Sequence, residues 1–233
     1  MAPQSRSFVP ILAAGALAPA LMLLHLAGFR LPVGHASEAA PMAPEPAPAG
    51  IVAGTDTAVF AGGCFWGVEA VFEHLTGVST AVSGYAGGTL ASPSYEEVST
   101  GRTGHAESVM VVYDPARISY DQLLQVFLTV AHDPTQLDRQ GPDVGPQYRS
   151  AVFYRNAAQR AAAERYIAKL RDAKIYPSPI VTEVTALNAF HPAEDYHQDY
   201  LVHHPNQPYI VINDAPKLEE LRRRFPNLYR AQG

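Results

Sequence analysis

The chain has a single cysteine, Cys64, and its neighbours indicate a reactive thiol. A β-rich segment ends at Gly62 and Gly63 before the cysteine, and helically spaced apolar residues follow it. Cys64 is therefore expected at a helix N-terminus, where free backbone N–H groups and the helix dipole favour a thiolate. The glycines permit a tight turn and close approach of a ligand, and Phe65 and Trp66 offer a flat apolar pocket. A core cysteine has no need of such glycines, so the pattern favours a nucleophile.

A second polar cluster lies near the carboxyl end. It contains four histidines and two carboxylates: His191, Glu194, Asp195, His197, His203 and His204. The cluster lacks a compact ligand motif such as His-Glu-x-x-His. We interpret the histidines as solvated or hydrogen-bonded side chains and predict no metal site.

The composition is that of a globular protein with a packed core, since 47% of the residues are hydrophobic and 17% are charged. The formal net charge is -5, and the basic run Arg222–Arg224 lies in an amphipathic pattern with Leu218, Leu221 and Phe225. We interpret this run as a solvated helix face and predict no nucleic-acid partner. One cysteine also excludes a disulfide within the chain.

The amino-terminal part is expected to precede the folded domain. Residues 1–36 contain an apolar run, Phe8–Gly28, that is long for a signal peptide and just long enough to span a bilayer. Prolines inside the run and small residues after it favour a cleaved signal peptide over a membrane anchor, and its apolar character argues against a transit peptide. Residues 37–54 are rich in Ala and Pro and are predicted to be a linker. Residues 55–233 then form an exported domain, periplasmic or anchored facing an extracytoplasmic compartment.

Strand-like and helix-like segments alternate within this domain. Strands are predicted at 57–61, 107–113, 151–154, 179–187 and 208–212. Helices are predicted after Cys64 up to Gly77, after the capping box Ser119–Gln122, and after Asn156 paired with Gln159. This alternation predicts a single α/β or α+β domain.

Seven short blocks follow one another along the chain: Gly63–Gly67 (Gly-Cys-Phe-Trp-Gly), Ser83–Gly88, Tyr95–Val98, Thr103–Glu107, Tyr113–Pro115, Asp143–Ser150 and His191–Gln198. With these blocks the sequence resembles the A-type peptide-methionine sulfoxide reductase family, from about Thr55 to Phe225. The resemblance implies a two-layer domain with a mixed central sheet and flanking helices. It also implies an oxidoreductase that uses a thiol to reduce methionine sulfoxide to methionine, repairing oxidised proteins.

The resemblance assigns catalytic roles to four residues. Cys64 attacks the sulfoxide sulfur, and Glu107 is the acid that protonates the departing oxygen. Glu107 opens an apolar strand, which agrees with partial burial and a raised carboxyl pKa. Tyr85 and Tyr148 are the hydroxyls that hydrogen-bond the sulfoxide oxygen. Taken without the resemblance, both tyrosines would be loop or core residues and Glu107 an undecided strand-end residue.

Three further residues are implied in substrate binding. Phe65 and Trp66 hold the methyl group, a contact that selects the S epimer at sulfur, and Asp143 helps to orient the substrate. On the sequence alone, Asp143 would be an ordinary turn residue before Val-Gly-Pro.

The chain departs from the family because it has no resolving cysteine. Ile210 follows Tyr209, where some members carry a cysteine. A sulfenic acid on Cys64 cannot close to an internal disulfide, so an external thiol such as a thioredoxin-like or glutaredoxin-like donor has to reduce it. No cofactor is expected. The expected partners of this monomer are the thiol donor and oxidised proteins, and the use of free methionine sulfoxide is left open.

Two other classes of function stay open at this point. A cysteine hydrolase or acyltransferase would pair Cys64 with a downstream histidine such as His191, and would need an orienting carboxamide or carboxylate and an oxyanion hole. A silent binding module would recognise oxidised methionine without turnover. Binding alone, however, needs no nucleophile beside Glu107, Tyr85 and Tyr148.

Overall fold

The computed structural model describes residues 54–231. The predicted leader, 1–36, and all but the last residue of the predicted linker lie outside the described residues. Among the described residues, no helix is long and apolar enough to cross a membrane.

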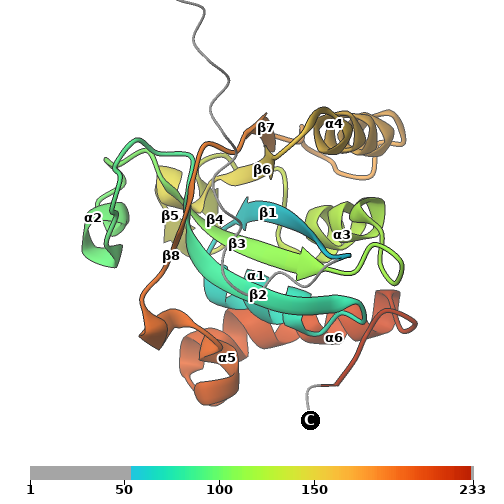
Figure 1. Cartoon of the computed structure of the whole chain (residues 1–233). Coiled ribbons are helices and arrows are strands. Elements are labelled where there is room, and N and C mark those ends of the chain that lie inside the picture. Colours follow the sequence, from blue (N-terminus) through green and yellow to red (C-terminus); the bar gives the residue numbers. More distant parts are fainter. Residues whose placement is uncertain (1–53, 232–233) are drawn as a thin grey trace, which may run out of the picture. The chain divides into compact units, whose positions relative to one another are not determined.

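A six-stranded sheet forms the centre of the domain (Figure 1). Its spatial order is β7 (Glu183–Ala186), β6 (Ser150–Tyr154), β1 (Asp56–Gly62), β3 (Ala106–Tyr113), β2 (Val78–Ala86) and β8 (Phe190–Pro192). The β6–β7 pair is parallel and the other pairs are antiparallel, so the sheet is mixed, as predicted. A separate hairpin joins β4 (Arg139–Gln140) and β5 (Asp143–Val144). The register places Tyr85 on β2 opposite Glu107 on β3, which brings two predicted site residues side by side.

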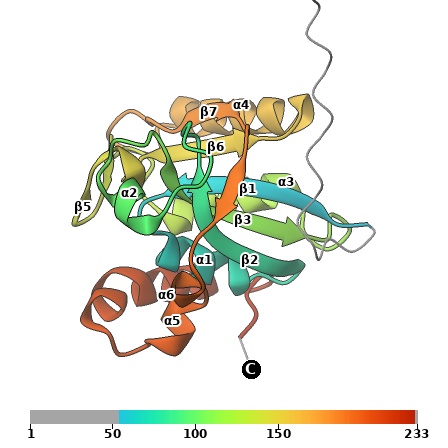
Figure 2. The same cartoon turned by 60° about the vertical axis from the view of Figure 1, so that its left-hand side comes forward.

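Helices cover one face of this sheet. The helices of the described residues are α1 (Phe65–Glu73), α2 (Tyr95–Ser99), α3 (Tyr120–Val126), α4 (Ala157–Asp172), α5 (Tyr200–His203) and α6 (Ala215–Arg224), with 3-10 turns at Pro146–Tyr148 and Asp195–His197 and π-helical turns at Phe127–Ala131 and Ile210–Asp214. The main core packs α1, α3, α4 and α6 against that face. Figure 2 shows β8 leading past β2 toward α5, so the carboxyl-terminal segment reaches the same side as α1.

Alternation of side chains along the strands divides the core between the two faces. Phe60 on β1 faces the helices and stacks on Phe72 and Phe127, with ring centroids 5.2 and 4.7 Å away. Its neighbour Val59 belongs to a smaller cluster on the opposite face, against which Phe190 packs. The two-layer arrangement follows from this division of apolar side chains.

Local sequence signals set the starts of two helices. Ser119 and Gln122 form the predicted capping box, and the Asn156 side chain accepts the Gln159 backbone N–H at 2.9 Å. These caps confirm the predicted starts of α3 and α4. The predicted strands at 57–61, 107–113 and 151–154 are confirmed as β1, β3 and β6.

Two predicted strands need correction. The segment 208–212 is not a strand, because it enters the π-helical turn Ile210–Asp214. Ile210 and Asp214 are buried while Val211 and Ile212 are exposed, a helical rather than an alternating pattern. The segment 179–187 is extended only at Glu183–Ala186. Strand β2 had no prediction, because polar residues such as Ser79, Thr80 and Ser83 interrupt its apolar pattern.

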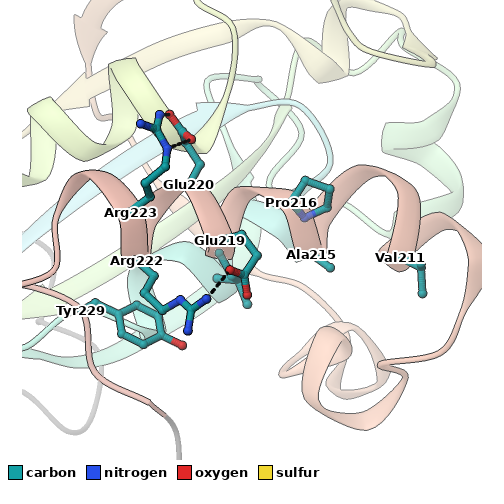
Figure 3. Close-up of a pocket in the computed structure, with 9 residues that line it drawn as sticks. Val211, Ala215, Pro216, Glu219, Glu220, Arg222, Arg223 and Tyr229 are labelled. Carbon is teal, nitrogen blue, oxygen red and sulfur yellow. Dashed lines mark hydrogen bonds and ion pairs between the residues drawn. The ribbon is translucent and has the colours of Figure 1, made fainter.

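The basic run on α6 is solvated, as predicted. Arg222 donates to Glu219 at 2.7 Å and Arg223 to Glu220 at 2.6 Å, and the four side chains line a shallow surface groove (Figure 3). None of the predicted site residues lines this groove, so it is not the candidate active site.

We predict that Gly67→Ala destabilises the protein, although Ala exceeds Gly by about 1 kcal/mol in a helix interior. A Cβ at Gly67 would lie 2.0 Å from Oδ1 of Asp214, whose short, buried side chain cannot swing away. Overpacking of this kind costs about 1–3 kcal/mol. Urea unfolding measures the loss, and Ala161→Gly on the exposed side of α4 is the matched control for helix propensity. A Gly67→Ala protein more stable than wild type would contradict the contact.

Candidate active site

Cys64 is the N-cap residue of α1 and is buried, with 8% of its surface exposed. The glycines before it do not leave room for a ligand, which corrects that part of the prediction. A Cβ at Gly62 would lie 2.8 Å from the His132 ring, and one at Gly63 would lie 2.5 Å from the Gln140 side chain. Gly63 also has a φ of 90°, which other residues rarely adopt. The glycines are required because the protein packs its own side chains against this turn.

Glu107 lies on β3, directly against the start of α1. Its Oε2 accepts the backbone N–H of Phe65 at 3.1 Å, and its side chain is 3% exposed. Burial raises the pKa of Glu107 to about 8, although the Phe65 N–H favours its charged form. The predicted burial and raised pKa are confirmed. Glu107 can therefore hold a proton at neutral pH next to the residue that follows Cys64.

The expectation of a resting thiolate at Cys64 is wrong. Burial raises the thiol pKa well above its ordinary value, and the negative charges of Glu107 and Asp214 raise it further. The backbone N–H of Trp66 and the ammonium of Lys217 act in the opposite direction but do not compensate. Burial raises the thiol pKa more than the helix N-terminus lowers it, because the first N–H group of α1 is already bonded to Glu107.

The two predicted tyrosines have different surroundings. Tyr85 is fully buried and its hydroxyl donates to Oε2 of Glu194 at 2.8 Å. Tyr148 is half-buried on the turn Pro146–Tyr148, where burial and then the charge of Glu107 raise its pKa. Smaller charge effects from Tyr95, Asp143 and Cys64 raise the pKa of Tyr148 in the same direction.

The predicted binding residues Phe65, Trp66 and Asp143 differ in exposure and in their contacts. Trp66 is half-buried, stacks on Tyr200 with ring centroids 3.7 Å apart, and meets Tyr209 edge-on at 6.0 Å. Phe65 is buried against Tyr85 at 5.9 Å, so Trp66 presents the more accessible aromatic face. Asp143, on β5, accepts a hydrogen bond from the Tyr209 hydroxyl.

Sequence reasoning missed four residues of this site. Tyr209 was assigned to a strand, but its ring meets Trp66 edge-on and its hydroxyl donates to Asp143. Burial, followed by the charge of Cys64, raises its pKa. Asp214 is buried and pairs with Lys217 at 3.0 Å against Gly67. Glu194 and His197 were grouped with the other histidines, and for His197 the hydrogen-bonded interpretation is confirmed by its contact with Trp66. No local signal in the sequence distinguishes these residues.

A carboxyl group, not a histidine, therefore contacts the helix start at Cys64. This arrangement does not fit a hydrolase that pairs Cys64 with His191, whose ring instead packs edge-on against His105 with centroids 5.3 Å apart. Within residues 54–231, no group of three or more His, Cys, Asp or Glu side chains could hold a metal ion. The fold and site define a cysteine-based enzyme in which a buried carboxylic acid assists the thiol.

Comparisons with known proteins identify the family. Residues 56–228 match the family described as peptide methionine sulfoxide reductase. The relative named peptide methionine sulfoxide reductase MsrA 2 from Mesorhizobium japonicum is 57% identical over 176 residues, covering 76% of this chain and 90% of the relative. MsrA from Chromobacterium violaceum is 51% identical over 173 residues, covering 74% and 98%. The chain belongs to the peptide methionine sulfoxide reductase family, as the resemblance indicated.

Solved structures agree with this assignment. Methionine sulfoxide reductase A of Corynebacterium diphtheriae matches with a TM-score of 0.59 and 39% identity, covering 67% of this chain and 78% of the other. Reduced Mxr1 from Saccharomyces cerevisiae matches with a TM-score of 0.62 and 32% identity, covering 66% and 88%. The predicted mixed sheet with flanking helices is therefore the fold of this family.

We predict that Glu107 makes stability depend on pH. Its pKa is 4.5 when unperturbed and about 8 in the folded protein. Between these values the unfolded chain releases the proton that the folded protein keeps, so stability falls as pH rises. Glu107→Gln does not titrate, and its free energy of unfolding should fall less across this window. Urea unfolding near pH 4.5 and near pH 8 measures the change in the free energy of unfolding between the two. Glu164→Gln, at an exposed position on α4, is the control and should show the same change with pH as wild type. Equal slopes for wild type and Glu107→Gln would contradict the buried acid.

Proposed function

We propose that the enzyme reduces methionine S-sulfoxide in oxidised proteins through Cys64, and that an external thiol restores the enzyme. The observation that carries this proposal is the bond between buried Glu107 and the start of α1, because it places a proton donor beside the nucleophile. The sulfoxide oxygen is a poor leaving group until it is protonated, which is the task of this acid. Membership of the family supports the reaction class.

The reaction transfers one oxygen atom. The Cys64 sulfur attacks the sulfoxide sulfur while Glu107 gives its proton to the oxygen, and the Tyr148 hydroxyl donates a hydrogen bond to that oxygen. The attack joins the two sulfur atoms as the sulfur–oxygen bond breaks, and the thiol proton replaces the one that Glu107 gave. The released oxygen, as water, then displaces the substrate sulfur from Cys64: a sulfur–oxygen bond forms on Cys64, and the sulfur–sulfur bond breaks with its electron pair on the thioether. The substrate sulfur is thereby reduced by two electrons, and Cys64 is oxidised by two electrons to a sulfenic acid. Thiol and sulfoxide thus become sulfenic acid and methionine, with no atom left over. Tyr85 is assigned to the same oxygen, although its hydroxyl donates to Glu194 in this structure.

The raised pKa of Cys64 has a role in this scheme. A protonated thiol is a weak nucleophile, so the resting enzyme reacts slowly with stray oxidants. The sulfur of a polarised sulfoxide carries partial positive charge, and its arrival beside Cys64 favours the thiolate. Activation is then coupled to substrate binding.

The aromatic residues determine which sulfoxide fits. Trp66, stacked on Tyr200 and edge-on to Tyr209, provides a fixed wall for the methyl group, and Phe65 backs it from inside. Asp143 holds the Tyr209 hydroxyl and so orients the second wall. A methyl group fixed on one side and an oxygen fixed on the other select one epimer, which we assign as S.

The single cysteine determines how turnover ends. No second thiol is available in the chain, so a small protein thiol of the thioredoxin or glutaredoxin type attacks the sulfenic acid directly. The enzyme needs no cofactor for this chemistry and works as a monomer. The apolar run in residues 1–36 supports export, to the periplasm or to a membrane-anchored position facing an extracytoplasmic compartment.

Turnover of a chiral methyl sulfoxide with dithiothreitol tests the function. We expect the S epimer to be reduced and the R epimer to be left unchanged. Cys64→Ser should have no measurable activity and a near wild-type unfolding midpoint, because oxygen replaces sulfur at a small buried position. Consumption of both epimers, or turnover by Cys64→Ser, would refute the assignment.

The oxidised enzyme should stop at a sulfenic acid. After one equivalent of substrate without reductant, intact mass should rise by one oxygen atom, and a dimedone-type probe should label Cys64 fully. Activity should follow the concentration of external thiol without the saturation that an internal disulfide exchange would impose. A disulfide-linked dimer through Cys64 as the main product would argue against a pocketed thiol.

A further inference from the structure

Glu194 and His197 each hydrogen-bond a different side chain of the site. Glu194 bonds Tyr85 and His197 bonds Trp66, and these two side chains are not hydrogen-bonded to each other. Oε2 of Glu194 accepts the Tyr85 hydroxyl at 2.8 Å. Nδ1 of His197 accepts the indole N–H of Trp66 at 3.1 Å. The indole is a donor only, so Nδ1 carries no proton and the neutral ring carries its proton on Nε2.

That second nitrogen has no hydrogen-bond partner. His197 is 2% exposed, and its Nε2 is buried without an acceptor in reach. The nearest carboxylate oxygen is Oε2 of Glu194 at 4.0 Å, which is too long for a hydrogen bond. It is the same oxygen that accepts the Tyr85 proton. A buried donor left unsatisfied costs about 1–3 kcal/mol, so its persistence needs an explanation.

The Tyr85 hydroxyl has one proton to donate, and in this structure it donates that proton in a hydrogen bond to Glu194. Tyr85 cannot donate to Glu194 and to a sulfoxide oxygen at the same time. If Tyr85 turns its proton to a substrate, Glu194 loses a donor, and the unpartnered N–H of His197 lies ready to replace it.

We infer that His197 is a positioning residue for Tyr85 and Trp66, and that Glu194 exchanges the Tyr85 hydroxyl for the His197 N–H when a sulfoxide binds. The inference rests on the proposed function. The exchange frees the Tyr85 proton for the sulfoxide oxygen and keeps constant the number of hydrogen bonds that Glu194 accepts from these two donors. Because the other nitrogen of His197 holds Trp66, the oxygen side and the methyl side of the pocket become linked.

The charges around this pair suit the exchange. Glu194 is partly exposed, and although burial opposes its charge, the Tyr95 N–H and Tyr85 hydroxyl hold its pKa below the ordinary value. Burial lowers the pKa of His197, against the raising effects of Glu194 and of Glu96 on α2. The remaining contacts of the imidazole are the rings of Phe65, Trp66, Tyr95 and Tyr196. At neutral pH, Glu194 is charged and the imidazole is neutral, as the exchange requires.

A double-mutant cycle with Tyr85→Phe tests the inference. His197→Asn places a carbonyl where Nδ1 accepts Trp66 and leaves nothing in the place of Nε2. We expect kcat to fall about tenfold with KM nearly unchanged, as for other supporting contacts around a site. In the Tyr85→Phe background, His197→Asn should cause no further loss, because the hydroxyl it serves is gone. Glu96→Gln changes the field at His197 without touching the network and should keep the wild-type kcat.

A second readout does not depend on activity. Trp66 is the only tryptophan in the chain, so tryptophan emission reports on the surroundings of this one side chain, His197 included. Acid protonates Nδ1 and breaks that bond, and the emission should titrate in wild type but not in His197→Asn. If wild type reduces no sulfoxide while the emission titrates, the proposed function fails and the network stands.

Two results would overturn the inference. Losses that add in both backgrounds would show a structural role, and an unchanged kcat in His197→Asn would show no role. If His197→Asn does not fold, Glu194→Asp at its partly exposed position draws the carboxylate back from both donors. Its kcat should also fall about tenfold in the wild-type background and should not fall further in the Tyr85→Phe background. Losses of kcat that add in the two backgrounds would again contradict the inference.

Discussion

The site depends on one hydrogen bond, from the backbone N–H of Phe65 to the buried carboxyl of Glu107. Most helices satisfy their first N–H groups with the side chain of the N-cap residue, but Cys64 makes no such bond. In this protein the carboxyl of Glu107, on the central strand β3, accepts that N–H group in place of an N-cap side chain. The bond joins β3 to α1, fixes the sulfur where strand becomes helix, and places a proton beside it. Burial then keeps that proton on Glu107 and keeps the thiol protonated, so both the acid and the nucleophile are uncharged until a substrate enters.

Much of the fold could be predicted where the signal was local. Strands β1, β3 and β6 are apolar runs, and α3 and α4 begin at capping residues visible in the sequence. Strand β2 was missed because polar residues interrupt its apolar pattern, and such a residue can bond to a neighbouring strand: the Ser79 hydroxyl donates to the Val112 carbonyl on β3 at 3.1 Å. The segment 208–212 has the composition of a strand, yet tertiary packing makes it the start of a π-helical turn. The composition of a segment predicts its secondary structure less well when residues far along the chain hold that segment in place.

The same division applies to the site. Cys64 could be recognised from its neighbours, whereas Glu107, Tyr85, Tyr148 and Asp143 needed the family resemblance. Tyr209, Asp214, Glu194 and His197 acquire their roles only from partners far along the chain, as in the 109-residue separation of Tyr85 and Glu194. The error about the thiolate has this origin too. A helix N-terminus can be predicted from sequence, but the carboxyl groups that fold against it cannot.

The contact of Asp214 with Gly67 has a consequence for how the protein matures. Asp214 and the helix it begins come from the last part of the chain, yet they lie against the first turn after Cys64. During synthesis, α1 is made long before the segment that covers it. Until that segment docks, the thiol lacks the carboxylate of Asp214 and part of its cover, so it is more acidic and more open to oxidants. The nascent chain is therefore most vulnerable to oxidative damage at the residue on which repair depends, and carboxyl-terminal docking ends that interval.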